Sequence, residues 1–132
     1  MYDDTLFASP MKTLLLALLL VTGSAWAEWV KVAEGDGVDL YIDLETIRKD
    51  GNRRRVWQIQ NLKQRGKDGE SSRRLRMEYD CKQERDRLVS FSFHSEPMAS
   101  GTALSNVDGG LGWADIPPGT LSEVVLKIVC AR

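Results

Sequence analysis

The sequence has few of the residues from which reaction centres are built. Its 132 residues include one histidine, His94, and two cysteines. It contains no Gly-rich phosphate loop, no His-Glu-x-x-His motif and no Gly-x-Ser-x-Gly turn, which are the signatures of phosphate-binding enzymes, zinc proteases and serine hydrolases. Two cysteines and one histidine are also a poor ligand set for zinc. We therefore expect no catalytic residues, no metal and no cofactor.

Long hydrophobic runs are also scarce, and the longest lies near the N-terminus. Residues 11–27 read "MKTLLLALLLVTGSAWA", in which Lys12 precedes an apolar core and Ala25-Trp26-Ala27 forms a small-x-small site. This order is typical of a secretory signal peptide cleaved after Ala27, with an uncleaved anchor as the alternative. Residues 1–10 carry two aspartates where a signal would be positive, so we expect them to be an extension ahead of a true start at Met11.

The expected mature chain is residues 28–132, long enough for one domain with a single core. It contains no further stretch of transmembrane length. The cleavage site has no cysteine to carry a lipid anchor. We therefore expect an exported protein that is periplasmic or secreted, or displayed at the cell surface.

Cys81 and Cys130 are open to three readings: a reactive thiol, a metal ligand or a disulfide. A catalytic thiol needs a histidine partner, and His94 is the only one available. In a small exported domain, two cysteines most simply pair with each other. Closing a loop of roughly 50 residues would stabilise the fold by about 4 kcal/mol on the chain-entropy model.

Alternation of apolar and polar residues predicts several strands and short turns. In residues 73–81, Leu75, Met77, Tyr79 and Cys81 share one face. We place Leu88 on the face of His94, and His94 at an exposed strand end. The predicted strands are residues 28–33, 38–44, 53–64, 73–81, 85–95 and, weakly, 102–107.

The pattern changes to a helical period near the C-terminus. Thr120 followed by Glu123 is a capping-box signature, and apolar residues then recur at helical spacing through Val129. The pattern predicts a helix of about three turns. Cys130 falls roughly opposite its apolar stripe, so we expect the last turn to unwind near the sulfur.

The charge is uneven along the chain. Residues 48–76 carry eleven Lys or Arg and three acidic residues, whereas residues 28–47 carry one Lys and six acidic residues. Such a basic segment can attract an anionic partner, or it can be a solvated face whose arginines pair with nearby acids. Nucleic acid is a poor candidate because no aromatic residues alternate with the cluster. The candidate binding residues are Arg53, Arg54, Arg55, Lys63, Arg65, Lys67, Arg73, Arg74, Arg76 and Trp113.

Several segments together resemble the surface-adhesin protein E family. They are "EWVKV", "LYIDLETIRKDG", "VWQIQNLK", "MEYDCKQERDRLVSFSF" and "GWADIPPGTLSEVVLKIVC", which cover essentially all of residues 28–130. The resemblance implies an α+β fold: a single antiparallel sheet of about six strands, with a C-terminal helix packed on its concave face and tied there by Cys81–Cys130. It also implies a binding protein without enzymatic activity.

We therefore predict an exported binding protein that contacts an extracellular or envelope macromolecule through the basic hairpin of residues 53–76. Its partner would be a matrix protein, a plasma protein or an anionic glycan. The alternative is a small periplasmic inhibitor or ligand-binding module that acts on an envelope enzyme or metabolite. The sequence leaves the oligomeric state open, a homodimer included.

Overall fold

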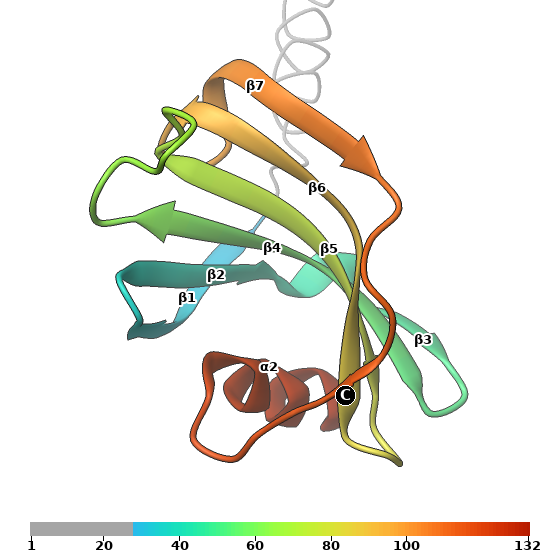
Figure 1. Cartoon of the computed structure of the whole chain (residues 1–132). Helices are drawn as coiled ribbons and strands as arrows, with labels where there is room; N and C mark the ends of the chain where they lie inside the picture. Colours follow the sequence, from blue (N-terminus) through green and yellow to red (C-terminus); the bar gives the residue numbers. More distant parts are fainter. Residues whose placement is uncertain (1–27) are drawn as a thin grey trace, which may run out of the picture.

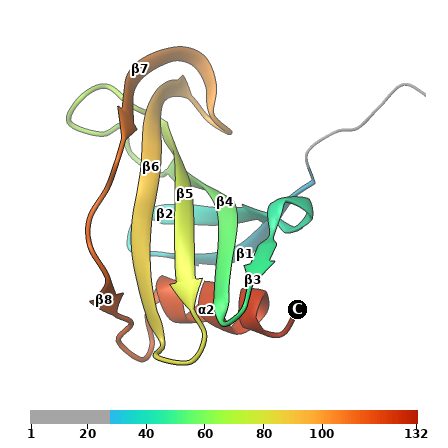
Figure 2. The ribbon, with the colours of Figure 1, turned by 90° about the vertical axis from the view of Figure 1, so that its right-hand side faces the viewer.

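The computed structural model describes residues 28–132. The expected extension, the start at Met11 and cleavage after Ala27 lie outside the described residues. The described chain forms one antiparallel sheet in the order β1-β2-β4-β5-β6-β7, with short β3 paired to β4 and β8 paired to β6. The sheet curves, and α2 lies against its inner side (Figures 1 and 2). The predicted α+β fold is confirmed.

The elements follow the predicted strands closely. They are β1 (Trp29–Gly35), β2 (Val38–Asp43), η1 (Leu44–Thr46), β3 (Arg48–Asp50), β4 (Arg53–Leu62), β5 (Ser72–Asp80), β6 (Arg85–Glu96), β7 (Ser100–Asp108), β8 (Ala114–Asp115) and α2 (Leu121–Cys130). The short η1, β3 and β8 were not expected. Asp36 and Gly37 turn the chain between β1 and β2 with positive φ angles of 52° and 76°, a conformation that asparagine, aspartate and glycine adopt most readily.

The core lies between the concave face of the sheet and α2. Ile42, Val56 and Tyr79 are buried there against Val125 and Val129 of the helix. Fully burying each apolar side chain of this size contributes about 1.5–3 kcal/mol. The hydroxyl of Tyr79 donates to Gln58 Oε1 at 2.6 Å, so its polar end is satisfied, and burial raises the pKa of this hydroxyl.

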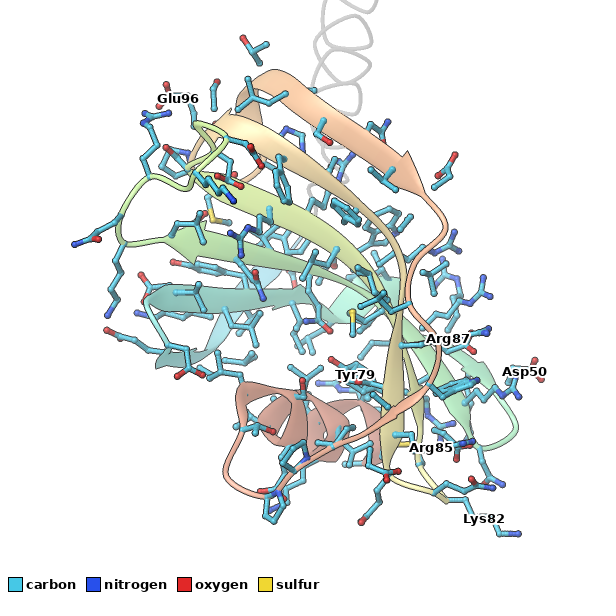
Figure 3. The ribbon with its side chains drawn as sticks, in the orientation of Figure 1. Asp50, Tyr79, Lys82, Arg85, Arg87 and Glu96 are labelled. Carbon is cyan, nitrogen blue, oxygen red and sulfur yellow. A yellow bond between two sulfur atoms is a disulfide. The ribbon has the colours of Figure 1, made fainter. Side chains whose placement is uncertain are left out.

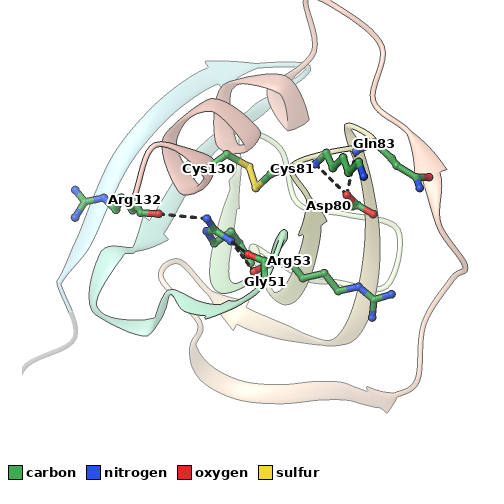
Figure 4. Close-up of a disulfide and its surroundings, with 9 residues drawn as sticks. Gly51, Arg53, Asp80, Cys81, Gln83, Cys130 and Arg132 are labelled. Atoms are coloured by element: carbon green, nitrogen blue, oxygen red, sulfur yellow. Dashed lines mark hydrogen bonds between the residues drawn. A yellow bond between two sulfur atoms is a disulfide. The ribbon is translucent and has the colours of Figure 1, made fainter.

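The helix is fixed at both ends. Thr120 is its N-cap, with Oγ1 accepting from the Glu123 backbone N–H at 3.3 Å. At the other end, the disulfide joins Cys130, the last helical residue, to Cys81, which directly follows β5 (Figure 4). The prediction of a disulfide is confirmed. The helix remains α-helical through Cys130, so the expected unwinding of the last turn was wrong.

A β-bulge in β6 changes which side chains share a face. Arg76 pairs with Ser90 but Met77 pairs with Leu88, so Val89 is an extra residue. Leu88 therefore lies on the face of Met77, and its predicted placement with His94 was wrong. Beyond the bulge, Arg87 lies opposite Glu78 and Arg85 opposite Asp80, on the face away from α2.

The expected exposure of His94 was also wrong. The His94 side chain is on the outer, convex side of the sheet, but neighbouring residues cover it and the residue is only 6% exposed. The Ser92 hydroxyl lies 2.7 Å from His94 Nε2. Burial, with a smaller contribution from the charge of Arg74, lowers the pKa of His94.

A candidate binding face of arginines and tryptophans

The convex face of the sheet, opposite α2, gathers arginines from four strands. Alternation directs Arg55 and Trp57 outward because Val56 between them lies in the core. The register then places Arg76 beside Trp57 and Arg48 beside Arg55. We call this surface the arginine face. It consists of Arg48, Arg53, Arg55, Arg74, Arg76, Arg85, Arg87, Trp57 and Trp113.

Glu78 is the acidic centre of the arginine face, and its side chain is only 5% exposed. Arg55 Nε donates to its Oε2 at 2.6 Å, while Arg87 and Arg53 nitrogens lie 2.9 and 3.8 Å from Oε1. Burial alone would raise the pKa of Glu78, but the Arg55 hydrogen bond and the charges of the three arginines outweigh it and lower the pKa. One carboxylate therefore forms ion pairs with three guanidinium groups.

Trp113 is the aromatic centre of one end of the face. The guanidinium carbons of Arg53, Arg85 and Arg87 lie 5.3, 5.3 and 4.8 Å from one of its ring centroids, within cation–π range. Figure 3 shows Arg85 and Arg87 projecting away from the side of the sheet on which Tyr79 and α2 lie. Trp113 arrives on the segment between β7 and β8, far along the chain from the arginines.

Trp57 occupies the middle of the face. The guanidinium carbons of Arg74 and Arg76 lie 5.3 and 5.6 Å from its ring centroid. A cleft of about 120 Å³ adjoins it, lined in part by Arg48, Arg55 and Arg76. A second cleft, of about 340 Å³, lies between Arg48, Asp50, Arg53, Arg55 and Glu78. Arginines supply three of the residues that line each cleft.

Other candidate residues lie away from this face. Arg54 is buried on the concave side, where it donates to the carbonyl oxygens of Gly51 at 2.8 Å, Arg53 at 2.9 Å and Arg132 at 3.4 Å (Figure 4). Arg73 also faces the concave side, with its guanidinium over Phe93. Arg54 and Arg73 therefore do not belong to the arginine face.

The loop between β4 and β5 carries three more candidates. Lys63 is paired with Glu34 at 2.6 Å, and Arg65 donates to the carbonyl oxygens of Gly69 and Ser95. Lys67 is exposed. Sequence reasoning missed Arg48, Arg85 and Arg87 as members of the face. A bulge shifts the last two outward, and strict alternation gives no sign of it.

One serine–histidine pair and no metal-binding group occur in the described part of the chain. The Ser92–His94 pair resembles a nucleophile with its base, but both residues are buried, and no carboxylate hydrogen-bonds this histidine within residues 28–132. Within the same range, no group of three or more His, Cys, Asp or Glu residues is placed to hold a metal ion. No helix among these residues has the length and apolar character needed to cross a membrane.

Comparison with known proteins places the chain in a family. The model of the family described as surface-adhesin protein E matches residues 29–131. The chain belongs to the surface-adhesin protein E family. A search of curated proteins found none that matches the chain.

Solved structures of Haemophilus influenzae protein E share the adhesin fold. Crystal form II matches with a TM-score of 0.65 and 18% identity, over 82% of this chain and 91% of that one. A second structure matches with a TM-score of 0.64 and 17% identity, over 82% and 87%. The structure from a non-typeable strain gives 0.62 and 19%, over 82% and 78%. At these identities the likeness shows the fold alone.

Proposed function

We propose that this member of the adhesin family is an exported, non-enzymatic binding protein that recognises an anionic macromolecule through the arginine face. The observation that carries the proposal is the convergence of seven arginines and two tryptophans on one side of the sheet. Guanidinium groups form strong, directional hydrogen bonds with sulfate, phosphate and carboxylate groups. The indole rings add flat surface on which a sugar ring or an apolar side chain can pack.

The charge of the face favours binding over simple mutual neutralisation. The strand register places five carboxylates on the same face as the seven arginines, those of Asp50, Glu78, Asp80, Asp108 and Asp115. Within residues 28–132, Arg74 and Arg76 make no salt bridge, and their guanidinium groups lie over the ring of Trp57. The face therefore keeps an excess of positive charge, which can steer an anionic partner although the whole chain has a net charge of only −1.

Retention on immobilised heparin tests the proposal. The double variant Arg74→Gln/Arg76→Gln removes two unpaired charges from the face, and we expect it to elute at lower salt than the unmodified protein. Lys63→Gln/Lys67→Gln removes the same charge from the loop and should elute close to the unmodified protein. If both double variants eluted at equally reduced salt concentrations, net charge and not this face would govern retention on heparin.

The kind of partner that the protein meets in the cell depends on whether the protein is displayed on the cell surface or kept in the periplasm. An adhesin displayed on the surface would be removed by protease added to whole cells, and its partner would be a matrix protein, a plasma protein or an anionic glycan. Release by osmotic shock, together with no retention on heparin or matrix proteins, would instead favour a periplasmic module. Cell fractionation, with the protein detected in each fraction by an antibody raised against it, distinguishes the two locations.

A further inference from the structure

Polar atoms without hydrogen bonds gather beneath Trp113. Six buried side-chain nitrogen or oxygen atoms among residues 28–132 lack a hydrogen-bond partner, and two of them are Arg85 Nε and Arg87 Nε, whose guanidinium groups lie over a Trp113 ring. Buried polar groups in folded proteins are nearly always satisfied. Two unsatisfied guanidinium donors in one place indicate a position suited to an additional acceptor.

The acids nearby do not fill that position. The single charge of Glu78 is divided among Arg55 at 2.6 Å, Arg87 at 2.9 Å and Arg53 at 3.8 Å. Asp80 accepts from the backbone N–H groups of Gln83 and Lys82, each at 3.0 Å, and these hydrogen bonds, with that from Gln83 the largest cause, lower its pKa. Arg85 contacts Asp80 only at 3.5 Å. Arg53, Arg85 and Arg87 therefore share less negative charge than they carry.

Trp113 covers this position from an irregular, largely exposed segment. Residues 109–113 have no regular secondary structure, and Leu111 among them is 76% exposed. Gly110 lies so close to the Leu88 carbonyl that a Cβ would collide with it, and β8 pairs with β6 just after Trp113. The segment is thus fixed on both sides of Trp113, whose ring makes cation–π contacts with three arginines.

We propose that Arg53, Arg85 and Arg87 form a discrete site for a sulfate or phosphate ester group borne on a sugar, and that Trp113 covers this site until the anion displaces it. Charge-assisted hydrogen bonds from guanidinium groups are stronger than cation–π contacts at an exposed site. The anion therefore displaces the Trp113 ring from the three arginines. A tetrahedral oxyanion also offers enough acceptors for all three arginines. This inference rests on the proposed function and narrows it to one end of the arginine face.

Calorimetric titration with sucrose octasulfate and with inositol hexakisphosphate tests the site. Arg87→Gln should bind about tenfold more weakly, because it loses a charge-assisted contact. Trp113→Ala should bind about three- to tenfold more tightly, because the competing ring is gone. Trp29→Ala, which removes an indole from β1, is the matched control and should bind as the unmodified protein does. Binding of sucrose octasulfate alone would identify the natural ligand as a sulfated glycan. Binding of inositol hexakisphosphate alone would identify it as a phosphorylated glycan.

A nuclear magnetic resonance (NMR) signal reports the displacement itself. On saturation with either probe, the indole N–H resonance of Trp113 should move to the position of a solvent-exposed indole. An unmoved resonance, or weaker binding by Trp113→Ala, would overturn the role of Trp113 as a cover. Normal binding by Arg87→Gln together with weak binding by Arg74→Gln/Arg76→Gln would overturn this site and leave the proposed function standing. Absence of binding to both probes and to heparin would refute both.

Discussion

Replacing Glu78 by glutamine should lower stability and strengthen anion binding at the same time. The carboxylate is almost fully buried and is contacted by Arg53, Arg55 and Arg87. Glutamine keeps the size of the side chain but removes the charge, so the hydrogen bond from Arg55 weakens and the ion pairs with Arg87 and Arg53 are lost. The arginine face gains one net positive charge.

The magnitude follows from these contacts. A hydrogen bond to a charged group contributes about 1.5–3 kcal/mol. Two close contacts are weakened in Glu78→Gln, and the arginine partners are a third to a half exposed, so solvent screening reduces the sum. We expect the free energy of unfolding to fall by about 2–3 kcal/mol. If the bound anion lies roughly 7 Å from residue 78, one unit of charge in a water-like dielectric changes affinity by roughly threefold at low salt.

Urea denaturation and titration with heparin measure the two effects on one protein preparation. Glu70→Gln is the matched control, because Glu70 is an equally buried glutamate whose nearest cation is Arg73 on the concave side, at 3.7 Å. It should leave heparin affinity unchanged. Unchanged stability in Glu78→Gln, or weaker heparin binding by that variant, would refute the reasoning.

Three further predictions follow. Arg54→Met should lower the free energy of unfolding by about 1–3 kcal/mol while leaving retention on heparin unchanged, since Arg54 serves buried carbonyl oxygens; reduced retention would contradict its assignment to the concave side. Cys81→Ala/Cys130→Ala should cost about 4 kcal/mol for a cross-link spanning 49 residues, a loss that reduction of the native protein should reproduce in urea denaturation. The lowered pKa of His94 means that the unfolded chain binds the extra proton first, so stability should fall as pH drops below about 6.5; His94→Asn should flatten this part of the stability–pH profile, and an unchanged profile would contradict the burial of His94.

The strands and the helix could be predicted because each follows from local chemistry. Alternation in residues 72–80 fixes which side chains enter the core, and the cap at Thr120 fixes where α2 begins. The disulfide followed from the cysteine count and the expected compartment. The family resemblance gave the placement of α2 on the concave face, which no local pattern determines.

The arginine face could be predicted only in part. Strand alternation alone separates Arg53 and Arg55 from Arg54, and the expected cluster combined all three. The bulge at Val89 moves Arg85 and Arg87 outward, and such bulges depend on pairing between strands more than on either strand alone. Trp113 joins these arginines through a contact between residues distant in sequence, for which alternation provides no signal.

The most direct test of the account is an NMR map of the arginine side chains. The Nε–Hε resonances of the protein would be followed during titration with a heparin oligosaccharide. The account predicts shifts for the arginines of the convex face, Arg48, Arg53, Arg55, Arg74, Arg76, Arg85 and Arg87, and none for Arg54. Shifts confined to Arg65 in the β4–β5 loop, or no arginine shifts at saturation, would contradict it.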